Sequence, residues 1–223
     1  MEKEPLYIAH KGDTINHLEN TPEAFESAFD KGADGIELDV HLSDRGEIIV
    51  VHDYLYDRSK TYPTLDEILA RFHSRGRIEI EVKELEVKAL AIISSIIDKY
   101  RPFDVEVTTS VQPLMSKIAL VFADDKRGLI FRRSLIEDWM PEDFRIKWIL
   151  SHLKLTGANV LHMDPDLYTP GIVEALHTGG LTAHTHIKAS NNEFASKARS
   201  LGIDQFTFDD IGLLSQKKRV IYS

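Results

Sequence analysis

Short apolar runs alternate with segments of helical periodicity along the whole chain. The first run, Leu6–Ala9, is followed by Thr21-Pro22, where threonine is expected to cap a helix and proline to occupy its first position. The expected strands are Leu6–Ala9, Gly35–Val40, Arg77–Lys83, Val105–Thr109, Gly128–Phe131, Val160–Met163, Leu181–His184 and Gln205–Phe208, with Glu47–His52 as an extended addition to the second. Helices are expected between the strands. The first begins at Thr21, and the others cover Thr64–Phe72, Glu86–Tyr100, Gln112–Phe122, Pro141–Leu155, Pro170–His177 and Asn192–Leu201.

This strand–helix alternation predicts a parallel sheet covered by helices. Eight such units in 223 residues favour closure into a (β/α)8 TIM barrel, with residues 1–223 as a single domain. An open, doubly wound sheet is the alternative. Neither a GxGxxG motif after the first strand nor a Walker A motif occurs, which weighs against a nucleotide-binding open sheet.

Composition narrows the possible partners and the cellular location. The net charge of −9 argues against nucleic-acid binding, which usually requires a basic face. The absence of cysteine excludes disulfides and sulfur-ligated zinc, and it is consistent with a cytoplasmic protein. No apolar run approaches about 20 residues, and the first residues lack the apolar segment of a signal peptide, so no membrane span is expected.

Carboxylates gather where the early strands end. Glu37 and Asp39 are two residues apart on one strand and therefore point to the same face, and Glu81 and Lys83 repeat this spacing on the next strand. In a barrel of this type the carboxyl ends of the strands form the active site. Carboxylates that converge there repel one another unless they pair with cations such as Lys83 and Lys11 or bind a hard divalent ion. We therefore expect either an ion-pair network or a site for Ca²⁺ or Mg²⁺.

Two histidines, His10 and His52, follow early strands and are candidates for acid–base catalysis, because histidine titrates near neutral pH. Most of the other histidines are expected to have no catalytic part. His162, His184 and His186 lie near the ends of late strands and are further candidates to line the pocket.

Six segments, in this order, resemble motifs of the glycerophosphodiester phosphodiesterase family. They are His10–Asp13 (HKGD), Glu19–Phe25 (ENTPEAF), Gly32–Val40 (GADGIELDV), Gly46–Asp53 (GEIIVVHD), Pro63–Leu69 (PTLDEIL) and Glu81–Lys83 (EVK). Each motif is modest alone, but their order is specific. The second half of the chain is similar only in its alternation of strands and helices.

The resemblance implies a metal-dependent phosphodiesterase that hydrolyses glycerophosphodiesters to an alcohol and glycerol 3-phosphate. Its substrate would be a small-molecule phosphodiester. The resemblance implies a role for each matching residue: His10 and His52 as general acid and base in undecided order; Glu37, Asp39 and Glu81 as ligands of one Ca²⁺ or Mg²⁺; and Lys11, Lys83, Glu19 and Asn20 at the substrate side.

The sequence departs from the family pattern at four places. Lys11 stands where arginine is usual and lacks the planar guanidinium that grips phosphate with two hydrogen bonds. Only Tyr54–Tyr62 occupies the place of a small insertion subdomain. A late WTVN-like segment is replaced by Ala183–His186, where His184 is nearest to the position of a substrate-contacting aromatic residue, and the last TDxP-like turn is Thr207–Ile211. The first of these changes bears on phosphate affinity, and the others bear on specificity for glycerol.

Three other functions compete with this hypothesis. The same chemistry could act on lipid diesters, as a lysophospholipase D-like or cyclic-phosphate-forming enzyme, with Tyr54, Leu55 and Tyr56 as an apolar rim. A catalytically silent barrel that binds phosphate-containing ligands would not need both histidines and all three carboxylates. A metal-dependent sugar isomerase would draw ligands from many strands, whereas here they are concentrated on the first three.

Overall fold

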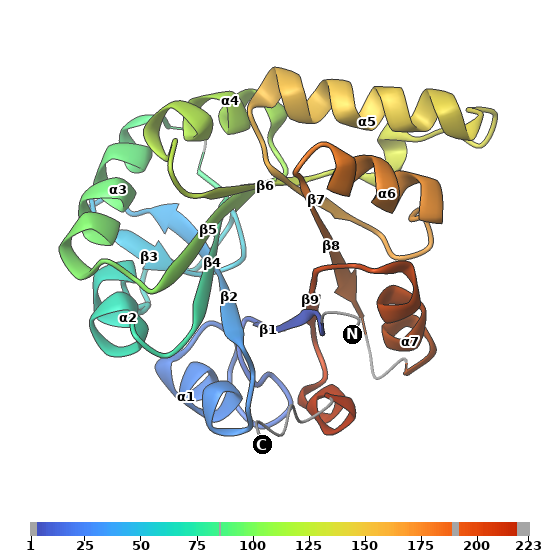
Figure 1. The fold of residues 1–223 in the computed structure, drawn as a ribbon. Coiled ribbons are helices and arrows are strands. Elements are labelled where there is room, and N and C mark those ends of the chain that lie inside the picture. The colour runs from blue at the N-terminus through green and yellow to red at the C-terminus, as the bar shows by residue number, and fades with distance from the viewer. Residues whose placement is uncertain (1–3, 85, 189–191, 218–223) are drawn as a thin grey trace.

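The computed structural model describes residues 4–84, 86–188 and 192–217. Within them, eight parallel strands form a barrel that closes because β1 pairs with both β2 and β9, and helices surround it (Figure 1). The strands are β1 (Leu6–His10), β2 (Gly35–Leu42), β3 (Ile48–Val50), β4 (Arg77–Val82), β5 (Asp104–Thr109), β6 (Lys126–Ile130), β7 (Val160–Met163), β8 (Thr182–Ile187) and β9 (Gln205–Phe208). The helices are α1 (Pro22–Asp30), α2 (Leu65–Phe72), α3 (Lys88–Tyr100), α4 (Gln112–Val121), η1 (Arg133–Leu135), α5 (Glu142–Thr156), α6 (Pro170–Thr178), α7 (Asn192–Leu201) and η2 (Ile211–Gln216). The predicted TIM barrel is confirmed.

The predicted helix starts have the expected capping geometry. Thr21 accepts a hydrogen bond from the backbone of the third residue of α1, and Thr169 does the same for α6, each directly before a proline. Thr64 and Glu67 form a reciprocal capping box at the start of α2. These polar caps satisfy backbone donors that the first helical turn leaves unpaired, so they fix where each helix begins.

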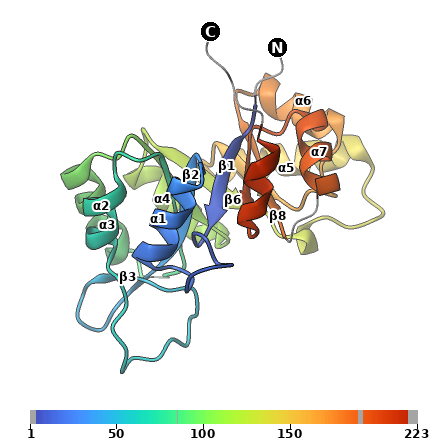
Figure 2. The same cartoon turned by 90° about the horizontal axis from the view of Figure 1, so that it is seen from below.

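The period of two along each strand separates apolar from polar side chains. On β2, Ile36 and Leu38 are fully buried toward the helices, whereas Glu37 and Asp39 alternate with them and point into the barrel. β3 pairs antiparallel with β2 as a short hairpin strand, as expected from the extended Glu47–His52 segment. Figure 2 shows β3 and the loops beside it extending past the barrel at one end. The barrel interior therefore contains ionisable groups where aliphatic layers are usual.

Two late elements differ from the sequence prediction. β8 continues to Ile187, three residues beyond the expected end at His184. The prediction stopped early because the interior positions of this strand are polar, so the apolar run that marks a strand is interrupted. A short η1 helix and an irregular loop also precede α5, whose start at Glu142 agrees with the prediction.

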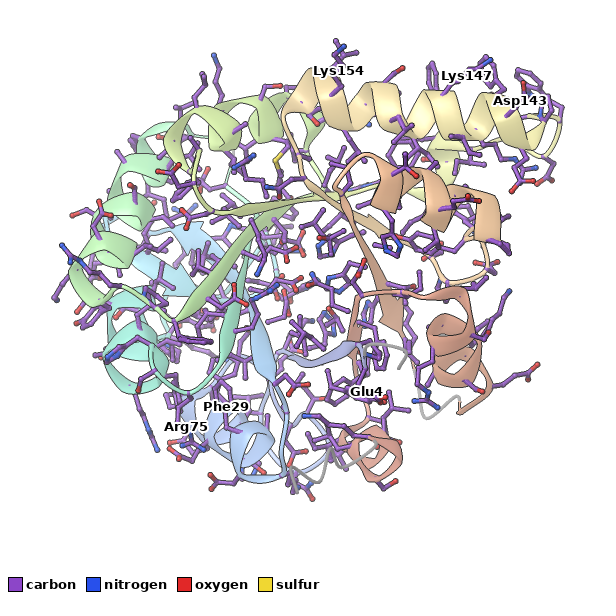
Figure 3. All side chains as sticks on the ribbon, in the orientation of Figure 1. Glu4, Phe29, Arg75, Asp143, Lys147 and Lys154 are labelled. Carbon is purple, nitrogen blue, oxygen red and sulfur yellow. The ribbon has the colours of Figure 1, made fainter. Side chains whose placement is uncertain are left out.

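The outer faces of the helices carry the charged residues. Figure 3 shows Asp143, Lys147 and Lys154 along the side of α5 that faces away from the barrel. At another edge of the molecule, the Arg75 guanidinium lies 5.2 Å from the centre of the Phe29 ring. No helix in the described part of the chain combines the length and apolarity needed to cross a bilayer.

Asp13, the last residue of the HKGD motif, is fully buried and connects the loop after β1 to α1. Its carboxylate accepts hydrogen bonds from Ser27, Asn16 and Lys31, and these donors lower its pKa to about 2 despite the opposing effect of burial. A carboxylate with a lowered folded-state pKa contributes stability above its unfolded pKa, and this contribution is lost as pH falls toward 2.

Replacing Asp13 with asparagine should lower the free energy of unfolding at neutral pH by about 2 kcal/mol. The difference from the unsubstituted protein should shrink between about pH 4 and pH 2, which urea unfolding at several pH values can measure. Asp44→Asn is the control, because its carboxylate pairs with Arg58 on the surface and should contribute less than about 1 kcal/mol. Equal losses for the two variants would contradict a specific role for Asp13.

Candidate active site

A cavity of about 290 Å³ contains ionisable side chains from the ends of several barrel strands. One part of its lining consists of acidic residues and histidines, and another contains basic residues from the loops after β6 and β8. The first group is His10, Glu37, Glu79, Glu81, His162 and His186, and the second is Arg132, Arg133 and Lys188. The polar lining and the position at the carboxyl ends of the strands make this cavity the candidate active site.

The three carboxylates predicted to hold a metal ion are brought together. Glu37 and Asp39 lie on β2, and Asp39 is paired in register with Glu81 on β4. One oxygen of each carboxylate lies within 4.8 Å of the others. Lys83 extends beside them, with Nζ 3.2 Å from Asp39 Oδ1 and 3.0 Å from Glu81 Oε1.

Lys83 offsets only part of the negative charge of this group. Burial, together with the neighbouring carboxylates, raises the pKa of Glu37 well above its ordinary value, and burial is also the main cause of the raised pKa of Glu81. Asp39 Oδ1 is buried and accepts no well-aligned hydrogen bond among the described residues, and its charge is balanced in part by Lys83 Nζ at 3.2 Å. An oxygen-only donor set with excess negative charge fits a hard divalent cation such as Ca²⁺ or Mg²⁺.

The loop between β1 and α1 holds the carboxylates from one side. The Asn20 side chain donates to Asp39 Oδ2 at 3.1 Å and accepts from the Asp39 backbone N–H at 3.3 Å. The Lys11 backbone N–H lies 3.2 Å from Glu37 Oε2, and Lys11 Nζ reaches Glu19 at 3.3 Å. Lys11 and Asn20 both have left-handed backbone conformations, with φ of 57° and 58°, so the loop accepts local strain to place these groups.

Gly12 explains why the HKGD motif contains a glycine. Its φ is 85°, and a Cβ at this position would lie 2.7 Å from the backbone carbon of Ala24 in α1. The first turn of α1 therefore approaches the loop so closely that only glycine fits.

The two ring nitrogens of His10 face different carboxylates. Its Nδ1 is 2.7 Å from Asp209 Oδ1, and its Nε2 is 3.8 Å from Glu37 Oε2. Burial lowers its pKa, although Asp209 opposes this effect, and the neutral ring is thereby favoured. If Nδ1 donates its proton to Asp209, the Nε2 lone pair is free to accept one. The sequence reasoning did not identify Asp209 as a partner of His10.

His52 lies farther out than His10. Its side chain is 42% exposed, and its Nδ1 is 3.0 Å from the Asp53 carboxylate. It lines a neighbouring cavity together with Glu19 and Asn20, and it does not line the cavity that contains His10. Its charge nevertheless contributes to the electrostatics of the carboxylates: Asp39 is buried, yet Lys83, Asn20 and His52 keep its pKa below the ordinary value.

The three late histidines occupy different depths. His162 and His186 line the cavity, as proposed for these strand ends, but His184 does not. His184 is 1% exposed and its ring stacks on His162, while its nitrogens contact Thr207 and Gln205 inside the barrel. The structure therefore does not bring His184 to the position predicted for a substrate-binding residue. The alternation of side chains along β8 indicates that His184 points into the barrel, but it does not indicate how far the side chain lies from the cavity.

A second group of buried ionisable residues extends from the cavity wall, where Glu79 and His162 lie, into the barrel interior. Arg77 Nη1 donates to Glu106 at 2.8 Å, and His162 Nε2 is 2.6 Å from the other oxygen of Glu106. Glu79 lies 3.7 Å from His162 Nδ1, and burial raises its pKa well above the ordinary value. The contacts of His162 join β7 to β4 and β5, which are not its neighbours, so they cross the interior and could not be deduced from strand patterns alone.

Comparison with known proteins agrees with this geometry. Residues 10–109, which carry the carboxylates and both predicted acid–base histidines, match the model of the glycerophosphoryl diester phosphodiesterase family. Over this part of its length the chain is similar to the glycerophosphodiester phosphodiesterase family. Among its relatives is a glycerophosphodiester phosphodiesterase from Caldanaerobacter subterraneus subsp. tengcongensis, 54% identical over 54 residues. That match covers 24% of this chain and only 22% of the relative.

Solved structures extend the similarity to the whole fold. A glycerophosphodiester phosphodiesterase from Thermotoga maritima has a TM-score of 0.77 and 23% identity, covering 97% of this chain and 99% of that one. An Oleispira antarctica phosphodiesterase, solved with the product sn-glycerol-3-phosphate, has a TM-score of 0.77 and 17% identity, covering 95% of this chain and 96% of its own. At these identities the likeness establishes the shared barrel.

Two departures from the family pattern can now be placed in the fold. Lys11 points to Glu19 on the β1–α1 loop, and it does not line the main cavity. The segment in place of the insertion subdomain leaves Tyr54 and Leu55 57% and 96% exposed. Tyr56 is less exposed and packs against His41 and Tyr62.

Proposed function

We propose that this chain is a metal-dependent phosphodiesterase that hydrolyses glycerophosphodiesters to an alcohol and glycerol 3-phosphate. The observation that carries the proposal is the convergence of Glu37, Asp39 and Glu81 within 4.8 Å, with His10 Nε2 3.8 Å from Glu37. Together they provide a cation site and a proton acceptor in one polar cavity. The match of the family model to this part of the chain supports the same reaction class.

Glu37, Asp39 and Glu81 are the residues that would hold one Ca²⁺ or Mg²⁺, since their donors are all carboxylate oxygens. Such an ion, when bound, supplies charge stabilisation to the phosphoryl oxygens. Asn20 and Lys83 orient the carboxylates through the contacts to Asp39. Arg132 and Lys188 line the cavity without a carboxylate partner among the described residues, so they can attract the anionic diester.

His10 is proposed as the general base. Asp209 accepts the Nδ1 proton, which fixes the tautomer whose Nε2 accepts a proton from water. The water oxygen then forms a bond to phosphorus as the bond from phosphorus to the alcohol oxygen breaks. His52, at the rim, is proposed to donate a proton to that leaving oxygen, with Asp53 holding its ring. Proton acceptor and donor are thereby assigned to separate sides of the site.

The direct test is release of glycerol 3-phosphate from glycerophosphocholine and glycerophosphoethanolamine by purified protein. We expect release with Ca²⁺ or Mg²⁺, and a rate of release at least about 100-fold lower after EDTA treatment. The three carboxylates repel the anionic substrate when no cation is present. Restoration by one cation would identify the preferred ion. Undiminished release in EDTA would contradict the metal dependence, and no release with any cation would contradict the glycerophosphodiester assignment.

A lipid diester is the second candidate substrate, and the exposed apolar residues around the site favour it. Leu55 is 96% exposed and Tyr54 57%, both on the loop after the hairpin strand β3, and Trp139 is 66% exposed on the loop between β6 and α5. Such a rim can hold an acyl chain beside the polar cavity. Choline release from lysophosphatidylcholine, with assay for cyclic phosphate product, distinguishes this function. If neither substrate class turns over, a silent phosphate-binding barrel becomes the better hypothesis.

A further inference from the structure

His10, His186 and Asp209 form a compact group separate from the three carboxylates. His10 Nδ1 and His186 Nε2 approach the same oxygen, Asp209 Oδ1, at 2.7 and 2.8 Å. One donor atom from each residue lies within 4.8 Å of the other two. The two imidazole rings are 4.4 Å apart at their centres and inclined by 60°, so their nitrogens converge on one point without the rings stacking.

Three adjacent strands carry the residues of this group. His10 is the last residue of β1, His186 lies on β8, and Asp209 follows β9 directly. β9 pairs with both β1 and β8, so three hydrogen-bonded strands position the three side chains. Both histidines line the cavity, and Asp209 is 37% exposed at its side chain. A ligand that enters the cavity can therefore reach the group.

The donor set differs chemically from the carboxylate site. Two imidazole nitrogens and one carboxylate oxygen suit borderline ions such as Zn²⁺ or Co²⁺, whereas oxygen donors alone suit Ca²⁺ or Mg²⁺. Ligand atoms about 2.1 Å from a tetrahedral ion lie roughly 3.4 Å apart. The nitrogen-to-oxygen distances of 2.7 and 2.8 Å are those of hydrogen bonds, and small side-chain shifts would open them to this spacing. We propose that His10, His186 and Asp209 bind a borderline transition-metal ion, with Zn²⁺ as the leading candidate.

Occupation of this site would oppose the proposed catalytic role of His10. An ion bound at Nδ1 leaves the ring proton on Nε2, and a nitrogen that already carries a proton cannot accept another. Zn²⁺ would thus inhibit the enzyme at a site distinct from the one that activates it. This consequence rests on the proposed function, whereas binding of the ion does not.

Binding can be measured without an activity assay. Co²⁺ is added to purified protein in the presence of excess Mg²⁺, and its visible absorption, which reports nitrogen ligation, is followed during titration; Zn²⁺ then displaces it. We expect His186→Ala to weaken Co²⁺ and Zn²⁺ binding by on the order of tenfold or more, since one of three ligands is lost. His177→Ala is the matched control, because His177 also contacts an aspartate, Asp204, at 3.0 Å but lines a different cavity.

The two variants give outcomes that decide the proposal. Weaker binding in His186→Ala, with His177→Ala unchanged, supports the site. Equal affinity in His186→Ala and the unsubstituted protein, or no Co²⁺ binding by either, overturns it.

An inhibition assay separates the binding site from its consequence. With glycerophosphocholine as substrate, each protein's rate in Zn²⁺ is divided by its own rate without Zn²⁺. We expect at least about tenfold inhibition of the unsubstituted protein and a smaller effect on His186→Ala. Strong Co²⁺ binding without any turnover would contradict the proposed function and leave the ion site standing. Binding without inhibition would contradict the proposed effect on His10.

Discussion

Replacing His10 with alanine should reduce the turnover number for glycerophosphodiesters by about 10²–10⁴-fold, the usual contribution of general acid–base catalysis. The side chain is 24% exposed and sits at the edge of the cavity, so its loss should change the free energy of unfolding little. Turnover with saturating cation and thermal unfolding of the same samples measure both effects. His177→Ala removes another histidine that contacts an aspartate, and its turnover should stay near that of the unsubstituted protein.

The partner of His10 provides a second readout of the same mechanism. Asp209→Asn should also lower turnover by on the order of 10²-fold or more, because an amide can donate to Nδ1 and so favour the tautomer that carries its proton on Nε2. Since burial lowers the pKa of His10, its base form persists toward lower pH, and the acidic limb of the pH–rate profile should lie below about pH 6.5. A His10→Ala variant with a near-normal rate would refute the assignment of the base.

The early part of the site could be predicted from sequence because its geometry is local to strands. The two-residue spacing of Glu37 and Asp39 fixes their common face, and the parallel register then places Glu81 beside Asp39. The rule that catalytic groups lie at the carboxyl ends of barrel strands then assigns these carboxylates to the active site. These relations need only the strand pattern and the closure of the barrel.

Contacts across the barrel could not be predicted in this way. His10 and Asp209 are 199 residues apart and meet only because β9 pairs with β1. The sequence placed Asp209 in a terminal turn, but nothing in the local pattern gave the direction of its carboxylate. The depth of a side chain within the barrel is likewise absent from a strand's alternation, which explains why His184 lies in the interior while His186 reaches the cavity.

The polar barrel interior also made late strands difficult to delimit. Strand prediction depends on apolar runs, but β8 contains His184, Thr185 and His186 in succession. Strand pairing to β7 and β9 keeps this segment extended regardless of its composition. Tertiary hydrogen bonding therefore outweighed local propensity at the residues that approach the candidate site.

Glu37→Gln should abolish most of the stabilisation that Ca²⁺ or Mg²⁺ gives to this protein. At about 100 times the dissociation constant, a cation bound only to the folded state raises the free energy of unfolding by about 2.7 kcal/mol. Glutamine keeps the shape of Glu37 but removes a charged ligand, so the same cation concentration should stabilise the variant far less. Urea unfolding with and without cation measures the difference.

Without cation, Glu37→Gln should leave the free energy of unfolding unchanged or raise it. The pKa of Glu37 is raised mainly by burial and next by Asp39, so its ionisation destabilises the folded chain as pH rises. Glutamine cannot ionise, and the cation-free variant should therefore be at least as stable as the unsubstituted protein near pH 7 and above. A purely structural ion pair would behave oppositely, because its removal would destabilise the cation-free protein.

Glu47→Gln is the matched control for this experiment, since Glu47 lies exposed on the turn before β3. It should retain the full cation-dependent stabilisation and a nearly unchanged free energy of unfolding. If Glu37→Gln gained as much stability from cation as Glu47→Gln, Glu37 would not be a ligand. Equal stabilisation of both variants is also the result expected if the cation acts only by general screening of the acidic protein and not by coordination.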